Sequence, residues 1–175
     1  FLGNTPSFGV RLISTSGSAN INTQDSIILN LIRMTNGTIN FNMNDSIIVN
    51  TLNFSGGTLT GNSPMRVTNQ FNWSGGTLAA TDSTIVTVIQ SQALFSVNNR
   101  ALRKRTLINQ GTITWTGGHW ENYDGAIIQN NTGALIDAQS DHFFYYNGGT
   151  VTKFTNNGTL RKSGGTAVTT IQIQC

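Results

Sequence analysis

Charged side chains are scarce in this sequence. Asp, Glu, Lys and Arg together make up 10% of the 175 residues, whereas they make up about 25% of an ordinary soluble domain. Because Gly, Asn, Thr and Ser are abundant instead, amides and hydroxyls must cover most of the surface. The net charge is only +3, from 10 basic and 7 acidic residues, which is too small an excess to indicate a nucleic-acid partner.

Cysteine, proline and long apolar runs are equally rare. The single cysteine, Cys175, has no partner in the chain, so the fold is predicted to be held without an intrachain disulfide. No apolar run approaches the roughly 20 residues of a membrane helix, and no membrane span is predicted. The prolines, Pro6 and Pro64, lie outside the candidate strands, which favours uninterrupted strand ladders. The few histidines are scattered and Asp-x-Asp spacing is absent, so neither a metal site nor a cofactor is predicted.

What the sequence does contain is a short pattern that returns every 19 or 20 residues. Residues 25–28 (DSII) return as residues 45–48, and residues 36–39 (NGTI) return as residues 56–59 and 75–78 (both GGTL). This spacing is typical of a solenoid, in which copies of one small unit stack on one another.

Apolar residues recur at matching positions of this unit. Within each repeat one polar residue separates the first two of them, which indicates a strand with one buried face. Gly-Gly and Asn-Gly pairs follow and suit tight corners. We therefore predict an all-β fold, a right-handed parallel β-helix (β-solenoid) of about 20 residues per coil and roughly eight to nine coils. The predicted core ladders contain Ile32, Leu52 and Phe71; Met34, Phe54 and Trp73; and Ile39, Leu59 and Leu78.

The repeat loosens along the chain, although one solenoid domain is predicted over residues 1–175. Residues 109–113 (NQGTI) reappear 47 residues later as residues 156–160 (NNGTL), which predicts two coils with a few inserted residues. The predicted divisions are an N-terminal coil or cap at 1–24, regular coils at 25–80, an irregular insertion at 81–105 and longer coils at 106–175.

The segments 109–118 and 156–166 resemble the repeats of large secreted bacterial β-solenoid proteins, the right-handed parallel β-helices of adhesin-like and surface-array proteins. The resemblance covers roughly residues 52–171. It implies a secreted or cell-surface location and a structural or adhesive role, and it implies no particular ligand. A chain that begins at Phe1 instead of Met also suggests a processed or truncated product.

One cluster of side chains could bind a glycan or a partner protein. A histidine, a carboxylate and several aromatic residues crowd together only here, and an aromatic ring can stack on the face of a sugar. An exposed variant of the strand ladder would explain the same residues. The candidate surface contains His119, Trp120, Glu121, Tyr123, Tyr145 and Tyr146.

The same cluster leaves an enzymatic alternative open, because parallel β-helices often carry polysaccharide-degrading sites. Hydrolysis needs two carboxyl groups about 5–10 Å apart, and depolymerisation should then be lost on Glu121→Gln. Asp25 and Asp45 should stack in adjacent coils, but their place in a repeated corner indicates hydrogen bonds to backbone amides. No catalytic residue is therefore predicted, and the chain is interpreted as a non-enzyme.

Four cations within six positions form a second candidate, a polyanion patch of Arg100, Arg103, Lys104 and Arg105. A solvated rim of one coil is the competing explanation.

The favoured function is an extracellular structural or adhesive β-solenoid, a segment or subunit of a cell-surface filament or large adhesin. Open solenoid ends expose unpaired strand edges, which predicts self-association end to end or continuation in a longer chain. The alternative is a polysaccharide-binding or polysaccharide-degrading β-helix protein.

Overall fold

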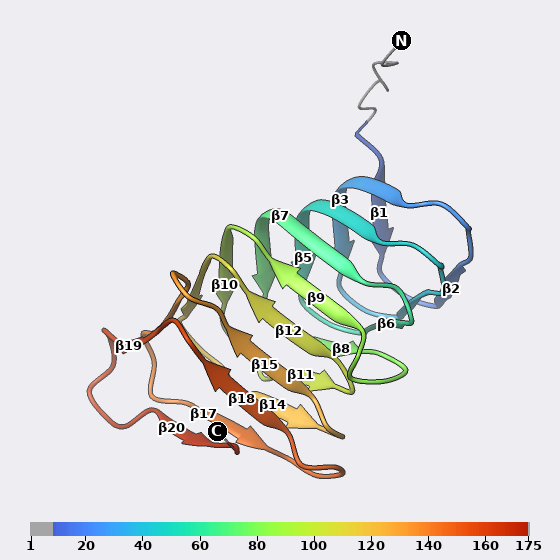
Figure 1. Ribbon diagram of the computed structural model, residues 1–175. Coiled ribbons are helices and arrows are strands. Elements are labelled where there is room, and N and C mark those ends of the chain that lie inside the picture. Colours follow the sequence, from blue (N-terminus) through green and yellow to red (C-terminus); the bar gives the residue numbers. More distant parts are fainter. Residues whose placement is uncertain (1–8, 175) are drawn as a thin grey trace.

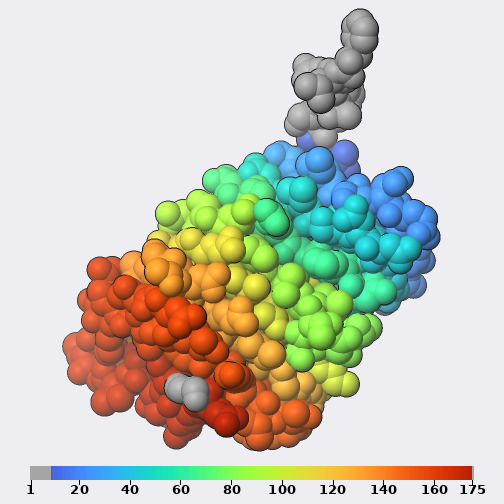
Figure 2. All heavy atoms as spheres, viewed as in Figure 1, coloured from blue at the N-terminus to red at the C-terminus, as the bar shows by residue number. Residues whose placement is uncertain are grey.

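The computed structural model describes residues 9–174. Within this range there is no helix, and all paired strands run parallel in stacked coils about 20 residues apart, in about eight turns. Figure 1 shows the chain winding around a single axis, and Figure 2 shows successive coils as adjacent bands of colour. The predicted all-β parallel solenoid is confirmed. Cys175 lies outside the described residues, as do residues 1–8.

Two sheets enclose the core. The narrow sheet has 8 strands, one per coil: β2 (Ser18–Ile21), β4 (Thr38–Phe41), β6 (Thr58–Gly61), β8 (Gly76–Ala79), β11 (Arg100–Arg103), β14 (Trp120–Tyr123), β17 (Phe143–Tyr146) and β20 (Thr170–Gln172). The wide sheet has 12 strands: β1 (Arg11–Ser14), β3 (Ile27–Met34), β5 (Ile47–Phe54), β7 (Met65–Trp73), β9 (Val86–Ile89), β10 (Gln92–Phe95), β12 (Thr106–Asn109), β13 (Thr112–Trp115), β15 (Ile127–Asn130), β16 (Leu135–Ala138), β18 (Lys153–Asn156) and β19 (Thr159–Lys162).

The wide sheet divides at β7. The first part of β7 pairs with β9, with Met65 opposite Thr87, and its second part pairs with β10, with Phe71 opposite Ala93. From that coil onward, two short strands replace each long strand. Because Thr112 pairs with Leu135, which in turn pairs with Thr159, the 47-residue recurrence does span two coils, as predicted.

The three predicted core ladders are confirmed. In the first, Ile32 pairs with Leu52 and Leu52 with Phe71, and all nine ladder residues are buried. Apolar side chains thus stack at the spacing of the β-ladder, about 4.8 Å. Burying this surface stabilises the fold by about 25 cal/mol per Å² of apolar area.

Aromatic rings continue the core through the middle coils. Trp73 stacks on Phe71 with ring centroids 5.4 Å apart and meets Phe95 edge-on at 5.2 Å. Phe95 in turn contacts Trp120 at 5.0 Å, and Trp120 stacks on Phe144 at 4.6 Å. Aromatic pairs at these separations add about 0.5–1.5 kcal/mol each beyond their area burial.

An asparagine ladder occupies the corner between the two short strands of the wide sheet. The Nδ2 of Asn109 donates to the Oδ1 of Asn130 at 2.8 Å, and the Nδ2 of Asn130 donates to the Oδ1 of Asn156 at 2.7 Å. Asn109 and Asn130 are fully buried. Because each amide also donates to a backbone carbonyl of the next coil, that of Leu135 or Thr159, the ladder satisfies polar groups that the corner would otherwise leave unpaired.

Tight corners between coils require glycine at defined positions. Gly57 has φ 85° and Gly118 has φ 69°, a region that L side chains rarely adopt. A Cβ at Gly57 would clash with the carbonyl oxygen of Gly37 one coil before, and a Cβ at Gly118 would clash with the carbonyl of Asn98. The recurring Gly in the sequence pattern therefore marks close backbone approach between coils.

Residues 81–105 contain three strands, β9, β10 and β11, which join both sheets in register. The longest stretch without a strand there is the segment 80–85 that precedes β9. The N-terminal segment also forms a coil within the described residues, since β1 pairs with β3 and β2 pairs with β4.

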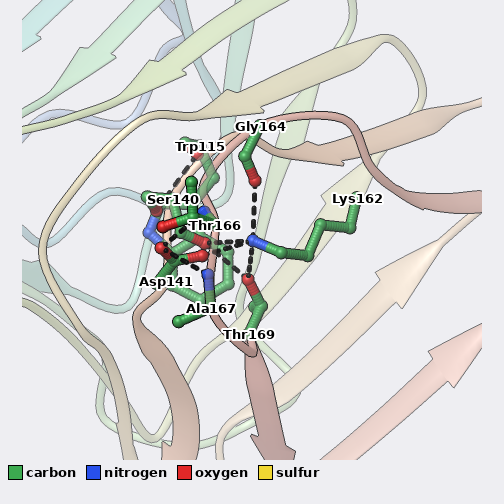
Figure 3. A network of polar contacts seen from close by, with 8 residues as sticks. All are labelled: Trp115, Ser140, Asp141, Lys162, Gly164, Thr166, Ala167 and Thr169. Carbon is green, nitrogen blue, oxygen red and sulfur yellow. Dashed lines mark hydrogen bonds and ion pairs between the residues drawn. The ribbon is translucent and has the colours of Figure 1, made fainter.

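Polar contacts hold the segment between β19 and β20 (Figure 3). The Nζ of Lys162 donates to Asp141 at 2.6 Å and to the carbonyl of Gly164 at 2.7 Å. The other oxygen of Asp141 accepts the backbone N–H groups of Thr166 and Ala167 at 3.0 and 3.1 Å. These bonds lower the pKa of Asp141, with the Lys162 contact as the largest cause.

Asp137 and Arg161 form a second ion pair between neighbouring coils. Arg161 donates from Nε and Nη2 to the two oxygens of Asp137 at 3.0 and 2.8 Å, and Asp137 is buried. The hydrogen bonds from Arg161 hold the pKa of Asp137 well below its usual value. A carboxyl group with a depressed folded-state pKa stabilises the fold above its unfolded pKa, about 3.9, and loses this contribution as the pH falls through the folded pKa.

We expect Arg161→Met to lower the free energy of unfolding by about 1–3 kcal/mol at pH 7. The difference from the unsubstituted protein should shrink as the pH falls from about 4 toward the depressed folded-state pKa of Asp137, because the unfolded chain then binds a proton that the folded, ion-paired carboxylate does not. Urea denaturation between pH 2 and 7 measures this difference. Arg33→Met, at an exposed position of the same wide sheet, is the control. A difference in unfolding free energy between Arg161→Met and the unsubstituted protein that stays constant over this pH range would contradict the prediction.

Candidate functional site

The candidate site lies on the outer face of the narrow sheet, across β11, β14 and β17. Alternation along β14 turns Trp120 and Asn122 into the core and leaves Glu121 and Tyr123 partly exposed. On β17 Phe144 is buried, whereas Phe143 is 42% exposed. Since Glu121 lies directly opposite Tyr145 in the ladder, the outward side chains of two coils form one surface. We call it the ring surface, which contains Asn99, His119, Glu121, Tyr123, Phe143, Tyr145 and Asn147.

Three neutral donors hold the Glu121 carboxylate. Its Oε1 accepts from the Nδ2 of Asn99 at 2.9 Å, and its Oε2 accepts from the hydroxyl of Tyr123 at 2.7 Å and the Nδ2 of Asn147 at 3.3 Å. Asn147 also donates to the Tyr123 oxygen at 2.6 Å. These donors come from three different coils, so the carboxylate has a fixed orientation.

The two tyrosines of the ring surface remain protonated at neutral pH. Burial, followed by the hydrogen bond to Glu121, raises the pKa of Tyr123 to about 12. Burial is also the largest cause that raises the pKa of Tyr145, with Glu121 contributing. Both phenols can therefore act as hydrogen-bond donors.

His119 organises the aromatic side of the ring surface. Its ring centroid lies 5.3 Å from that of Phe143 and 6.1 Å from that of Tyr145. The Nδ1 of His119 accepts the backbone N–H of Phe143 at 3.0 Å, and its own backbone N–H donates to the Oδ1 of Asn99 at 2.9 Å. His119 directly precedes β14. Its imidazole thus takes the place of a backbone carbonyl in accepting this hydrogen bond, which joins the start of β17 to the neighbouring coil.

A cation lies at the edge of this surface, but it already has a partner. The guanidinium of Arg103 stands over the Tyr123 ring at 4.7 Å and pairs with Asp124 at 2.8 Å. Exposed ion pairs of this kind contribute little to stability, yet this one offsets the charge of Arg103 locally.

Two residues of the predicted glycan surface do not face a ligand as expected. Trp120 is fully buried and stacks on Phe144, so its prediction as a surface residue is wrong, because strand alternation turns it into the core. Tyr146 is partly buried, and its hydroxyl donates to the carbonyl of Gly149. The sequence alone did not predict Phe143, Asn99 and Asn147 as site residues. The run of aromatic residues at 143–146 was a signal that could have identified Phe143.

The predicted polyanion patch is also wrong for two of its four residues. Arg100 and Arg105 are each only 1% exposed. Arg105 donates to Thr87 Oγ1 at 2.8 Å and to the carbonyls of Ala79 and Ser63 at 2.6 Å each. Burial lowers its pKa to about 10, so Arg105 stays charged at neutral pH. Its hydrogen bonds join three coils from inside the solenoid.

Arg100 binds backbone carbonyls in the same manner. It donates to Gly117 at 2.5 Å and to Ser96 and Asn98 at 3.2 Å each, and it lies over the Phe95 ring at 5.2 Å. Burial lowers its pKa to about 9. Of the predicted patch only Arg103 and Lys104 are exposed, and they do not form a four-cation surface.

Asp45, one of the two aspartates predicted to stack, takes part in local structure. Asp45 Oδ1 accepts the backbone N–H of Ser46 at 2.7 Å, and hydrogen bonds, first from Ser26, lower the pKa of Asp45. The prediction of a backbone contact is confirmed for Asp45. Within residues 9–174 there is no group of three or more His, Cys, Asp or Glu residues that could hold a metal ion, and no helix long and apolar enough to cross a membrane.

Comparison of this chain with protein-family models, with curated proteins and with solved structures gives no match. The fold and the ring surface therefore carry the functional inference.

Proposed function

We propose that this chain is an extracellular adhesive β-solenoid that binds carbohydrate through the ring surface. The observation that carries the proposal is the Glu121 carboxylate on β14, held by neutral donors beside the rings of Phe143 and Tyr145 on the neighbouring strand β17. Binding sites commonly combine aromatic faces with a few fixed polar groups. Here Phe143 and Tyr145 supply the rings, and Glu121 with its amide neighbours supplies hydrogen-bonding groups for sugar hydroxyls.

The scaffold suits an extended ligand better than a small molecule. The ring surface is an outer sheet face, and its rings lie on successive coils, so contacts repeat along the rod axis at about 4.8 Å. Strand ladders on both sides fix these positions before a ligand arrives. A polymer lying across several coils would therefore meet rigid, preorganised contacts.

Binding without cleavage is the form of the proposal that the contacts favour. Sugar hydrolysis requires a second carboxyl group about 5–10 Å from the first. Asp124, three residues after Glu121 in sequence, is engaged by Arg103 and is not free to act as that second group.

The resemblance of the repeats to those of secreted bacterial adhesin-like solenoids supports a secreted or cell-surface location. The low content of charged residues and the hydroxyl-rich and amide-rich surface agree with this setting.

A panel of immobilised polysaccharides tests the proposal by affinity electrophoresis. The unsubstituted protein should be retarded by at least one polymer, and Tyr145→Ala should weaken this binding about tenfold or more. Leu94→Ala, an exposed apolar position on the wide sheet, serves as the matched control and should bind unchanged. Circular dichroism of each variant verifies the fold. The proposal fails if no polymer retards the protein, or if Tyr145→Ala binds as tightly as the control.

A second candidate function is end-to-end assembly into a filament. At the last coil a hollow is lined by Lys153, Phe154, Thr155, Asn156, Leu160 and Ile171. Leu160 is 38% exposed there, and within the described residues β19 pairs only with β16, so an edge is open for another strand. Sedimentation velocity and negative-stain microscopy should reveal fibres that Leu160→Lys abolishes. Monodisperse short rods at every concentration would contradict this candidate.

A further inference from the structure

The charge of Glu121 has no cationic partner among its hydrogen-bonding neighbours. Its donors Asn99, Tyr123 and Asn147, and Tyr145, which also hydrogen-bonds to it, are all neutral. Arg103, the cation over the Tyr123 ring, is paired with Asp124 at 2.8 Å. The carboxylate therefore presents its negative charge to whatever lies on the ring surface.

The two oxygens of Glu121 are not equally occupied. Oε2 accepts two hydrogen bonds, whereas Oε1 accepts a single one, from Asn99. A carboxylate has about four acceptor positions, two on each oxygen. Oε1 thus accepts fewer of these three hydrogen bonds than Oε2, and a charged donor from a ligand would form a stronger bond there than a neutral donor.

Aromatic rings adjoin Glu121 and favour the same kind of ligand. Tyr145 lies opposite Glu121 in the ladder, and Phe143 lies beside Tyr145 with ring centroids 6.3 Å apart. The face of an aromatic ring attracts a cation by about 0.5–2 kcal/mol. A uronic acid or a sulfated sugar would instead place its negative charge against Glu121.

We propose that the ring surface is selective for amino sugars that carry a free ammonium group, as in deacetylated hexosamine polymers. The ammonium pairs with Oε1 of Glu121, and the sugar ring rests on Tyr145 and Phe143. This inference rests on the proposed carbohydrate-binding function and specifies its ligand class.

Calorimetric titration with three oligosaccharides tests the selectivity: a glucosamine hexamer, the N-acetylglucosamine hexamer of the same linkage, and a galacturonate hexamer. At about pH 6 the free amine is protonated, because this lies below the pKa of an aliphatic amine. The glucosamine hexamer should bind most tightly and should lose affinity as salt is added. Glu121→Gln should weaken its binding about tenfold or more and leave that of the N-acetylated hexamer unchanged. Asp82→Asn, which removes an exposed carboxylate from the segment 80–85, is the control and should behave as the unsubstituted protein.

The outcomes separate this inference from the proposed function. If glucosamine and N-acetylglucosamine hexamers bind equally and Glu121→Gln affects neither, selectivity for amino sugars is refuted while carbohydrate binding stands. Tighter binding of the galacturonate hexamer would overturn the inference in the same way. If none of the hexamers and none of the immobilised polysaccharides binds, the carbohydrate-binding function itself fails.

Discussion

Replacement of Trp73 by alanine is expected to lower the free energy of unfolding by about 3–5 kcal/mol. Trp73 is fully buried and its ring contacts those of Phe54, Phe71 and Phe95 at centroid separations of 6.1, 5.4 and 5.2 Å. These rings come from three successive coils, so the missing indole would leave a cavity that no single coil could fill by shifting.

Urea denaturation followed by far-UV circular dichroism measures this loss. Leu94→Ala provides the comparison, because Leu94 is on the neighbouring strand β10 but 36% exposed, and it should cost less than about 1 kcal/mol. Trp73→Phe keeps a ring in place and should fall between the two. If Trp73→Ala costs no more than Leu94→Ala, the aromatic stack does not hold the middle coils together.

Replacement of Arg105 by methionine should cost about 2–4 kcal/mol, although methionine fills much of the same volume. The guanidinium is the hydrogen-bond donor to the carbonyls of Ser63 and Ala79 and to the Thr87 hydroxyl. Its removal leaves buried acceptors unpaired, at about 1–3 kcal/mol for each such group. Part of this cost is offset because a buried charge is removed as well.

The control for this variant is Arg103→Met, two positions away on the same segment. Arg103 is exposed and makes one ion pair, with Asp124, so its loss should change stability by less than about 1 kcal/mol. Arg105→Lys should recover little of the loss, because one ammonium cannot reach three acceptors that a planar guanidinium reaches together. Equal stability of Arg103→Met and Arg105→Met would contradict the internal role of Arg105.

The sequence predicts the solenoid because its period repeats at the level of single residues. Ile32, Leu52 and Phe71 fall on one another in the sequence pattern and are paired neighbours in the sheet. The division of the wide sheet at β7 could not be predicted in this way. A period states how many residues close one coil, but whether a strand continues or breaks depends on corner packing, such as the buried amide of Asn109.

The candidate site was predictable in part for a similar reason. Glu121, Tyr123 and Tyr145 lie in strands, where alternation sets the direction of each side chain once its phase is known. Asn99 and Asn147 reach Glu121 from segments of other coils, and no local sequence pattern predicts these contacts. Arg100 and Arg105 were misplaced because an arginine is usually exposed, whereas here each guanidinium donates hydrogen bonds to backbone carbonyls inside the solenoid.

The division of the wide sheet has a mechanical consequence. The ladder hydrogen bonds join one coil to the next, so they run along the rod. A force that pulls the two ends of the chain apart therefore breaks these hydrogen bonds in sequence, one coil at a time. Each coil of about 20 residues that peels away adds at most about 70 Å of extended chain. Up to β7 each step opens one long ladder of the wide sheet, and beyond β7 each step opens two short ones, as at β9 and β10. The rod would lengthen under tension in discrete steps, and the ladders opened in each step change in kind at β7.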